Sequence, residues 1–393
     1  MIPLKLLFAA PCCLLDSSSG AAQSVRQLLQ RLPARGMAVQ ILGATLFDTQ
    51  AAAQALQEQV ASAAAAPGDW IRIRGGGLEH VLLRSHHWRR DRFTALEEAR
   101  FEARFRRLLQ RERPDALLLY GGMVLERLLL HEARRQGLAT LFYLANPTYG
   151  DPIAFCDVGQ VVTDTAATAE LYRARHGLQP TAIGKILEPA AVRPAARNPI
   201  AITFVNPSPE KGAALVVALA RRCRLELPEA RFLVVQSRGR WAPLLQHLEV
   251  TSQQLAPVEL LPPQSDMRPV FARTRVLLLP TYWHESGSRL ALEALLNGIP
   301  VLAAAHGGFS ELLEEAGALI EIPEATRRAP LQLPCDAVLE PWFEALKRLL
   351  RDPVAEAAAR ARAEQAAARY DPEATVSRFE AALRQAVARA ART

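Results

Sequence analysis

The chain has 393 residues, of which 50% are hydrophobic and 22% are charged, and its net charge is +7. This length suffices for two domains with proper cores, and the composition is ordinary for a soluble globular protein. The basic balance favours anionic ligands such as nucleotide diphosphates, or an acidic membrane surface. Nucleic acid is not indicated, because aromatic residues make up only 6% and no known nucleic-acid-binding motif is present.

The five cysteines are odd in number and have no C-x-x-C spacing, so neither a disulfide framework nor a zinc site is indicated. Residues 1–15 are apolar, but Asp16 and a Ser-Gly turn follow directly, which favours a first sheet strand over a signal peptide. No apolar stretch reaches the ~20 residues that span a bilayer. We expect a cytoplasmic protein, with the inner face of the membrane as the alternative location.

The first half alternates strand and helix patterns, as in a nucleotide-type α/β domain. We expect one helix over 51–66, and a basic helix over 91–111. The further expected elements are strands at 5–9, 39–42, 71–74, 116–120, 141–144 and 161–162, and a helix at 21–32.

The arginine-rich segment 84–113 permits two interpretations. Its basic charge is compatible with a membrane surface. Acidic residues at helical spacing from arginines favour a solvated amphipathic helix instead, which is the interpretation that we prefer. The expected partners are Glu97, Glu98 and Glu102 on one side and Arg100, Arg104 and Arg106 on the other.

The second half begins after a proline-rich stretch, 188–199, that is typical of a linker. A new alternating series follows, and Asp371-Pro372 predicts the start of a final helix that ends near Ala391. The expected strands are 202–205, 232–236, 258–261, 276–279 and 301–303.

The most informative motif is Glu285 followed, after seven residues, by Glu293. A buried-strand pattern precedes the pair, and a helical pattern ending at Asn297-Gly298 contains the second acid. In parallel α/β sheets, ligands bind at the carboxyl ends of strands, so both acids are within reach of one ligand.

This E-x7-E pair, the NGIPV strand at 297–301 and the GGFSE loop at 307–311 together resemble the retaining glycosyltransferases of family 4. The resemblance implies an α/β protein of the GT-B fold, with two Rossmann-like domains, parallel sheets and a cleft between them. The implied domains are 1–190 for the acceptor and 191–370 for the nucleotide sugar, and a helix over 371–393 that packs on the first domain.

By the same resemblance, Glu285 contacts the donor hexose, Glu293 the ribose hydroxyls and Lys211 the donor diphosphate. Lysine at a helix N-terminus is electrostatically disfavoured unless an anion binds there. The family usually has an arginine where this chain has Asn206. Asn206 is still a candidate donor-binding residue, and Arg238 is a candidate replacement for the missing charge. Lys211 as a plain surface lysine remains the alternative.

Backbone amides of Ser286, Gly287 and Ser288, ahead of the helix that contains Glu293, are expected to face the diphosphate. Gly20 stands where the family usually has two glycines that approach the donor or acceptor, and a simple turn is the alternative.

Three further residues are weaker candidates for contacts with the sugar or the acceptor. Tyr120 stands where many family members have a histidine, Asn146 ends the next strand, and His284 adjoins Glu285. A turn role for Asn146 and a loop role for His284 are the alternatives.

The implied reaction is metal-independent hexosyl transfer from a nucleotide-diphosphate sugar, which acts as a substrate, so no cofactor is expected. The chain has no D-x-D or HExxH motif. The acceptor is a small molecule, a glycan or a lipid-linked molecule. An epimerase or hydrolase on the same fold, and a non-catalytic nucleotide-sugar-binding protein, are the competing hypotheses.

Overall fold

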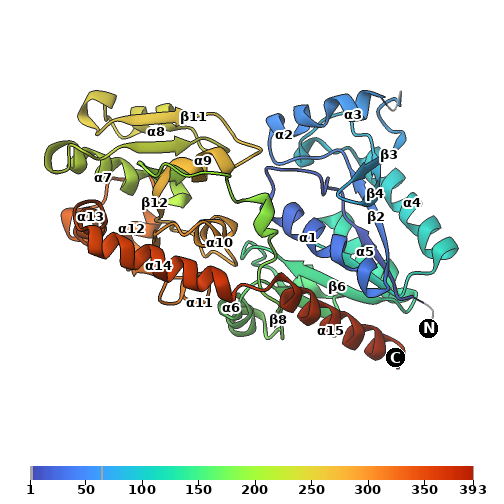
Figure 1. The fold of residues 1–393 in the computed structure, drawn as a ribbon. Helices are drawn as coiled ribbons and strands as arrows, with labels where there is room; N and C mark the ends of the chain where they lie inside the picture. Colours follow the sequence, from blue (N-terminus) through green and yellow to red (C-terminus); the bar gives the residue numbers. More distant parts are fainter. Residues whose placement is uncertain (1–2, 63–64, 393) are drawn as a thin grey trace. The chain divides into compact units, whose positions relative to one another are not determined.

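The computed structural model describes residues 3–62 and 65–392. The chain divides into two compact units, each built around a parallel sheet (Figure 1). Unit 1 comprises Met1–Ile186 and Pro372–Thr393, and unit 2 comprises Leu187–Asp371. No helix in the described ranges combines the length and the apolarity that crossing a membrane requires.

The described part of unit 1 contains an eight-stranded sheet in the order β3-β4-β2-β1-β5-β6-β7-β8. All neighbouring strands are parallel except β3 and β4, which form an antiparallel hairpin at the edge. Apart from the exposed Lys5 at the start of β1, the residues of β1, β5 and β6 are buried and almost all apolar, as a sheet covered by helices on both faces requires. The strands are β1 Lys5–Ala9, β2 Ala38–Ala44, β3 Trp70–Gly75, β4 Leu78–Leu83, β5 Ala116–Leu119, β6 Ala139–Leu144, β7 Gln160–Thr163 and β8 Thr181–Ala182.

Helices from both ends of the chain cover the unit 1 sheet. The last helix, α15 (Pro372–Ala390), packs against β6 and β7 and places Val376, Phe379 and Leu383 in the same core as β1. Arg35 of the segment after α1 forms ion pairs with Glu373 and Glu380 of α15. The other helices are α1 Gly20–Arg31, α2 Gln50–Ala55, α3 Gln57–Ser62, α4 Ala95–Glu112, α5 Val124–Arg135 and α6 Ala166–His176.

The described part of unit 2 contains a six-stranded, all-parallel sheet in the order β11-β10-β9-β12-β13-β14. The five strands expected in this half are confirmed within one or two residues. The strands are β9 Ala201–Val205, β10 Phe232–Val235, β11 Val258–Leu261, β12 Thr274–Leu279, β13 Val301–Ala304 and β14 Gly317–Ile320, and the helices are α7 Ala213–Glu226, α8 Trp241–His247, α9 Arg268–Arg273, α10 Arg289–Leu296, α11 Phe309–Leu313, α12 Glu324–Arg328, α13 Asp336–Arg351 and α14 Pro353–Arg369.

Two predicted helices differ from those observed. The helix expected over 51–66 is interrupted at Leu56, between α2 and α3, and residues 63–64 of that prediction lie outside the described part. The basic helix begins at Ala95 rather than at residue 91, because Thr94 and Glu97 form a capping box that fixes its first turn. Glu97 is therefore buried, and it does not belong to a solvated row of ion pairs.

The stretch 188–199 is not a free linker. Arg193 donates to the Leu296 carbonyl at 2.9 Å, and Arg197 donates to the carbonyls of Thr274 at 2.7 Å and Asn297. The start of unit 2 is thus bonded to the ends of α9 and α10. The proline content of residues 188–199 correctly indicated an irregular backbone, but it did not reveal these long-range contacts.

Candidate functional site

The carboxyl edge of the unit 2 sheet brings together the segments that carry the motif. Strand order reverses between β9 and β12, because β10 and β11 lie on one side of β9 and β12 to β14 lie on the other. Such a reversal is the point at which ligands bind in open parallel α/β sheets. Residues 206–212 follow β9, and residues 280–288 follow β12, so both loops leave the sheet at this point.

Lys211 and Glu285 meet at this edge. The Nζ atom of Lys211 forms an ion pair with Oε1 of Glu285, and the two side chains are 27% and 17% exposed. Lys211 ends the 3-10 turn η5 (Pro209–Lys211), directly before α7 begins. A cation and an acid from the loops after two neighbouring strands thus lie together, close to the N-terminus of α7.

The glycine pair after β13 supports the backbone of Glu285. The Gly308 amide donates to the Glu285 carbonyl at 2.7 Å. Gly307 has a φ of +66°, and a Cβ atom there would lie 2.8 Å from the Glu285 nitrogen. The next residue upstream, His306, contacts the Trp283 carbonyl through Nε2 at 3.1 Å. The GGFSE segment therefore serves to position the loop that contains Glu285.

The loop that contains Lys211 is bonded to both neighbouring loops. Asn206 has a φ of +63°, and its Oδ1 accepts from the Gly239 amide at 2.8 Å. The Tyr282 amide donates to the Glu210 carbonyl at 2.8 Å, and a Cβ on Gly212 would fall 1.9 Å from the Pro280 oxygen. Asn206 therefore acts in this structure as a link between two loops.

Ser286, Gly287 and Ser288 form the entry to α10. Ser288 is the N-cap, and its hydroxyl accepts from the Ala291 amide at 3.3 Å. Ser286 and Ser288 are buried, whereas Gly287 is partly exposed. The local sequence thus caps the helix with a serine, the residue type that favours this position.

Glu293 is buried inside α10 and is not a solvated helix residue. Its carboxylate lies 3.2 Å from Nη2 of Arg289, and the two side chains are 8% and 12% exposed. Arg289 was not among the predicted site residues, although its i,i+4 spacing from Glu293 was the signal that could have found it. Arg289 adds a second cation to this edge of the sheet.

Two other residues of unit 2 lie around this pair. Arg238 is exposed in the loop after β10, next to Gly239, and forms no ion pair within the described part of the chain. His284 is partly buried beside Glu285. Of the predicted contacts in this unit, the structure brings Lys211 and Glu285 into direct contact.

Burial sets the charge state of two groups beside the motif. It lowers the pKa of His306, with a further contribution from the charge of Arg327, and it raises the pKa of Tyr282 to about 12. Both groups are therefore neutral at pH 7. Neither group therefore adds a charge beside Lys211, Glu285 and the pair of Arg289 with Glu293.

The unit 1 candidates lie at the corresponding edge of their own sheet, where strand order reverses between β1 and β5. Gly20 begins α1, and no atom lies within 4 Å of a Cβ built on it. Tyr120, after β5, forms a side-chain hydrogen bond with Cys12, and burial raises its pKa. Asn146, after β6, accepts from the Thr148 amide at 3.1 Å, so its side chain closes a turn.

Comparison with known proteins gives one matching family model and a set of structures with a similar fold. Residues 199–335 match the family model described as glycosyl transferases group 1. No curated protein matches the sequence. Among solved structures, sucrose-phosphate synthase from Thermosynechococcus elongatus has a TM-score of 0.70 at 17% identity and covers 98% of this chain and 99% of its own.

Two more structures agree in fold. HepE from Anabaena, in complex with UDP and glucose, has a TM-score of 0.67 at 16% identity and covers 97% of this chain and 100% of its own. The pneumococcal O-GlcNAc transferase GtfA, in complex with UDP and GlcNAc, has a TM-score of 0.66 at 10% identity and covers 98% of this chain and 99% of its own. The chain has the GT-B fold. The segment that matches the family model lies within unit 2 and contains the strands β9 to β14.

Proposed function

We propose that this GT-B protein is a retaining hexosyltransferase of the family 4 type, which uses a nucleotide-diphosphate sugar. The observation that carries the proposal is the ion pair between Lys211 and Glu285 at the point where the order of the unit 2 strands reverses. A diphosphate needs a cation and a hexose needs a hydrogen-bond acceptor. Lys211 supplies the cation and Glu285 supplies the hydrogen-bond acceptor, and the two side chains lie together.

In the proposed reaction, the bond between the anomeric carbon and the diphosphate oxygen breaks, and positive charge develops on the sugar. Lys211 stabilises the negative charge on the leaving diphosphate, as a preorganised cation does in a water-poor site. An acceptor hydroxyl forms the new bond on the same face of the sugar, and its proton passes to the leaving diphosphate. Glu285 orients the hexose and stabilises its developing charge.

Glu293 is proposed to bind the ribose hydroxyls, with Arg289 holding its carboxylate in place. Amides at the entry to α10, from Ser286 to Ser288, add donors for the diphosphate. Arg238 supplies a further cation, and Gly20, Asn146, Tyr120 and His284 remain candidates for weaker contacts. The proposal requires no metal ion, because cationic side chains and helix-end amides take the charge of the leaving group.

Neighbouring structures suggest which donors to test first. HepE and GtfA were both solved with UDP, the former with glucose and the latter with GlcNAc. We therefore propose UDP-hexoses as the first donors, with other nucleotide sugars as the comparison. Binding to the folded state raises the melting temperature, so a thermal-shift screen ranks the donors before any acceptor is known.

The test is transfer by Lys211→Met and Glu285→Gln, two variants that keep side-chain size and remove charge. Each is expected to lower kcat/KM by about 10²-fold or more, the scale of losing one transition-state contact. Lys347→Met and Glu344→Gln are matched controls, because these two residues form an exposed ion pair in α13 of the same unit. Unchanged activity in Lys211→Met or Glu285→Gln would refute the site.

Product analysis separates the competing hypotheses. Retention requires the anomeric configuration of the product, measured by NMR, to equal that of the donor. Free hexose in place of glycoside would indicate a hydrolase, and an epimerised nucleotide sugar without acceptor would indicate an epimerase. Donor binding without turnover over a broad set of acceptors would indicate a non-catalytic binding protein.

A further inference from the structure

An exposed apolar patch lies on unit 1, where helix α5 faces the 3-10 turn η3 (Pro152–Phe155). Met123, Val124 and Leu128 are 51%, 64% and 51% exposed, and Ile153 is 42% exposed. These four are among ten exposed large hydrophobic residues in the described part of the chain. Single exposed apolar residues are normal, but a contiguous group indicates an interaction surface.

The core does not account for these residues. Helix α5 already buries one apolar face against the sheet through Leu125, Leu129 and Leu130. Val124 and Leu128 are four positions apart and therefore share a different, outward face of the helix. The outward apolar face is thus additional to the stripe that packing requires.

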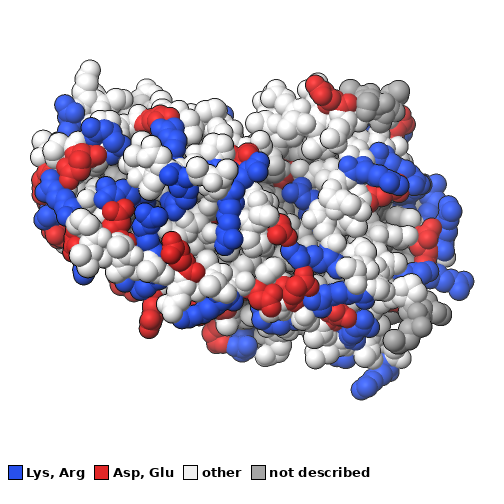
Figure 2. All heavy atoms as spheres, in the orientation of Figure 1, with Lys and Arg blue, Asp and Glu red and all other residues white. Residues whose placement is uncertain are grey.

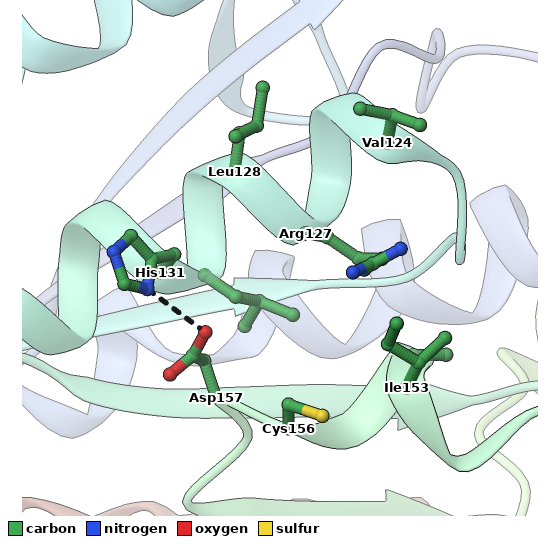
Figure 3. A pocket seen from close by; sticks show the side chains of 9 residues that line it. Val124, Arg127, Leu128, His131, Ile153, Cys156 and Asp157 are labelled. Atoms are coloured by element: carbon green, nitrogen blue, oxygen red, sulfur yellow. Dashed lines mark hydrogen bonds and ion pairs between the residues drawn. The ribbon is translucent and has the colours of Figure 1, made fainter.

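A hollow of about 220 Å³ separates α5 from η3 (Figure 3). Val124, Leu128 and Ile153 line it together with the exposed Cys156. His131 and Asp157, 3.2 Å apart, lie at one end, and Arg127 lies nearer the end formed by Ile153. Lipid acyl chains are flexible and can fill an apolar hollow of this kind that is open to solvent.

The patch offers one cation, Arg127, to an anionic partner. Arg127 forms no ion pair within the described ranges of the chain, although it lines an apolar hollow. Asp157 lies 3.2 Å from Nδ1 of His131 and 4.0 Å from Nε of Arg134. Asp151 is exposed beyond η3, where its carboxylate caps the turn by accepting from the Ile153 amide at 2.9 Å.

The basic segment around α4 is a weaker candidate for the same role. Figure 2 shows Lys and Arg side chains gathered where α4 lies in Figure 1, with acidic ones among them. Arg106 pairs with Glu102, Arg90 with Glu98 and Arg89 with Asp91. Internal pairing leaves less charge for a partner, and the exposed apolar residues of the patch lie on α5 and η3.

We propose that the patch of Met123, Val124, Leu128 and Ile153 docks on an anionic lipid bilayer. The four side chains enter the boundary between headgroups and acyl chains, lipid fills the hollow, and Arg127 reaches a headgroup phosphate. An apolar surface with a long basic side chain is the arrangement that interfacial binding uses. A basic residue near an anionic membrane surface is attracted to the lipid headgroups.

This docking is independent of the proposed transfer reaction and would present lipid-linked acceptors to unit 1. It is tested with the full chain and without nucleotide, by co-sedimentation with vesicles of phosphatidylglycerol and phosphatidylcholine. Binding to the mixed vesicles is expected, and Val124→Glu with Leu128→Glu should lower the partition coefficient about tenfold or more, since two buried side chains are lost. Arg127→Gln should remove most of the preference over pure phosphatidylcholine.

The matched control is Leu225→Glu with Val354→Glu, two exposed positions of unit 2 at 84% and 78% exposure. This control should bind vesicles like the wild type, and all variants should keep its melting temperature. The proposal fails if the wild type ignores anionic vesicles or if the patch variant binds them equally well. The proposal also fails if the patch variant changes only the oligomeric state, because the patch would then be a dimer interface. It fails as well if a monomeric short-chain lipid binds while vesicles do not, because the patch would then be a site for single lipid molecules.

Discussion

Lys211 and Glu285 are 74 positions apart in the chain, and they form an ion pair at the edge of the unit 2 sheet. Partly exposed pairs of this kind contribute about 0–1 kcal/mol to stability, because solvent screens them and ordering two long side chains costs entropy. The ion pair therefore adds little to the free energy of unfolding, and stabilisation of the fold does not explain its presence. A donor diphosphate would compete with Glu285 for the ammonium group, and this competition would leave the carboxylate for the hexose.

His80 of β4 gives a prediction about pH. It is fully buried, with Nε2 at 3.3 Å from the Gly75 carbonyl, and burial lowers its pKa to about 4. The unfolded chain binds a proton at this histidine below pH 6.5, whereas the native state stays neutral. Stability therefore falls as the pH drops from 6.5 to 4, by about 3 kcal/mol from this residue alone.

Urea unfolding of wild type and His80→Gln at pH 7 and pH 4.5 measures this contribution. The variant cannot take up the proton, so it should lose less stability on acidification than the wild type does. His87→Gln is the control, because it makes the same histidine-to-glutamine change at an exposed position. Equal acid-induced losses in wild type and His80→Gln would contradict the assignment.

At the scale of elements, four loops at one sheet edge hold each other in place. Asn206 links the loop after β9 to the loop after β10, and Gly307 and Gly308 link the loop after β13 to Glu285. The resemblance suggested an arginine-like role in donor binding at position 206. The structure shows an asparagine in the left-handed conformation that this residue type tolerates, bonded to a neighbouring backbone.

Gly307→Ala tests the coupling between loops. A Cβ there would meet the Glu285 backbone, so the variant should lose about 1–3 kcal/mol of stability and most of its transfer activity. Gly177→Ala is the control, because Gly177 has nearly the same φ, +67°, with nothing within 4 Å of the added atom.

The control should lose about 1 kcal/mol from the left-handed backbone alone and keep full activity. Thermal unfolding and kcat/KM are measured on both variants. Backbone strain affects both variants, whereas displacement of Glu285 affects only Gly307→Ala. Equal activity losses in the two alanine variants would show that backbone strain, and not the contact with Glu285, is responsible.

For the whole molecule, the two units differ in how the chain builds them. Unit 2 is continuous, whereas unit 1 takes its last helix from the end of the chain. Phe379 of α15 is fully buried in the core that also contains β1, β5 and β6. The stability of unit 1 therefore depends on residues far away in the sequence.

Phe379→Ala is expected to cost about 3–5 kcal/mol, the usual result of removing a buried aromatic ring. Hydrogen exchange should accelerate in β1, β6 and β7, and it should stay nearly unchanged in β9 to β13. Phe343→Ala, which empties a fully buried site in α13 of unit 2, should give the opposite pattern. Acceleration confined to unit 2 in Phe379→Ala would contradict the described packing.

Part of this structure could be predicted from the sequence because buried parallel strands are continuous apolar runs. The runs at 276–279 and 301–303 identified β12 and β13 within two residues. Strand β14 escaped prediction because it is a short edge strand with a mixed burial pattern, and β8 because it has two residues. The expected helix start at residue 91 was wrong, although Thr94 and Glu97 contained the correct signal.

The sequence by itself determined the alternating α/β pattern, its parallel strands and the spacing of Glu285 and Glu293, because these depend on local periodicity and on residue type. Only the tertiary structure decided that Lys211 contacts Glu285 and that Arg197 anchors the start of unit 2. The assignment of α15 to unit 1 was decided in the same way. Such contacts join residues that are brought together by strand order and packing, which no local pattern encodes.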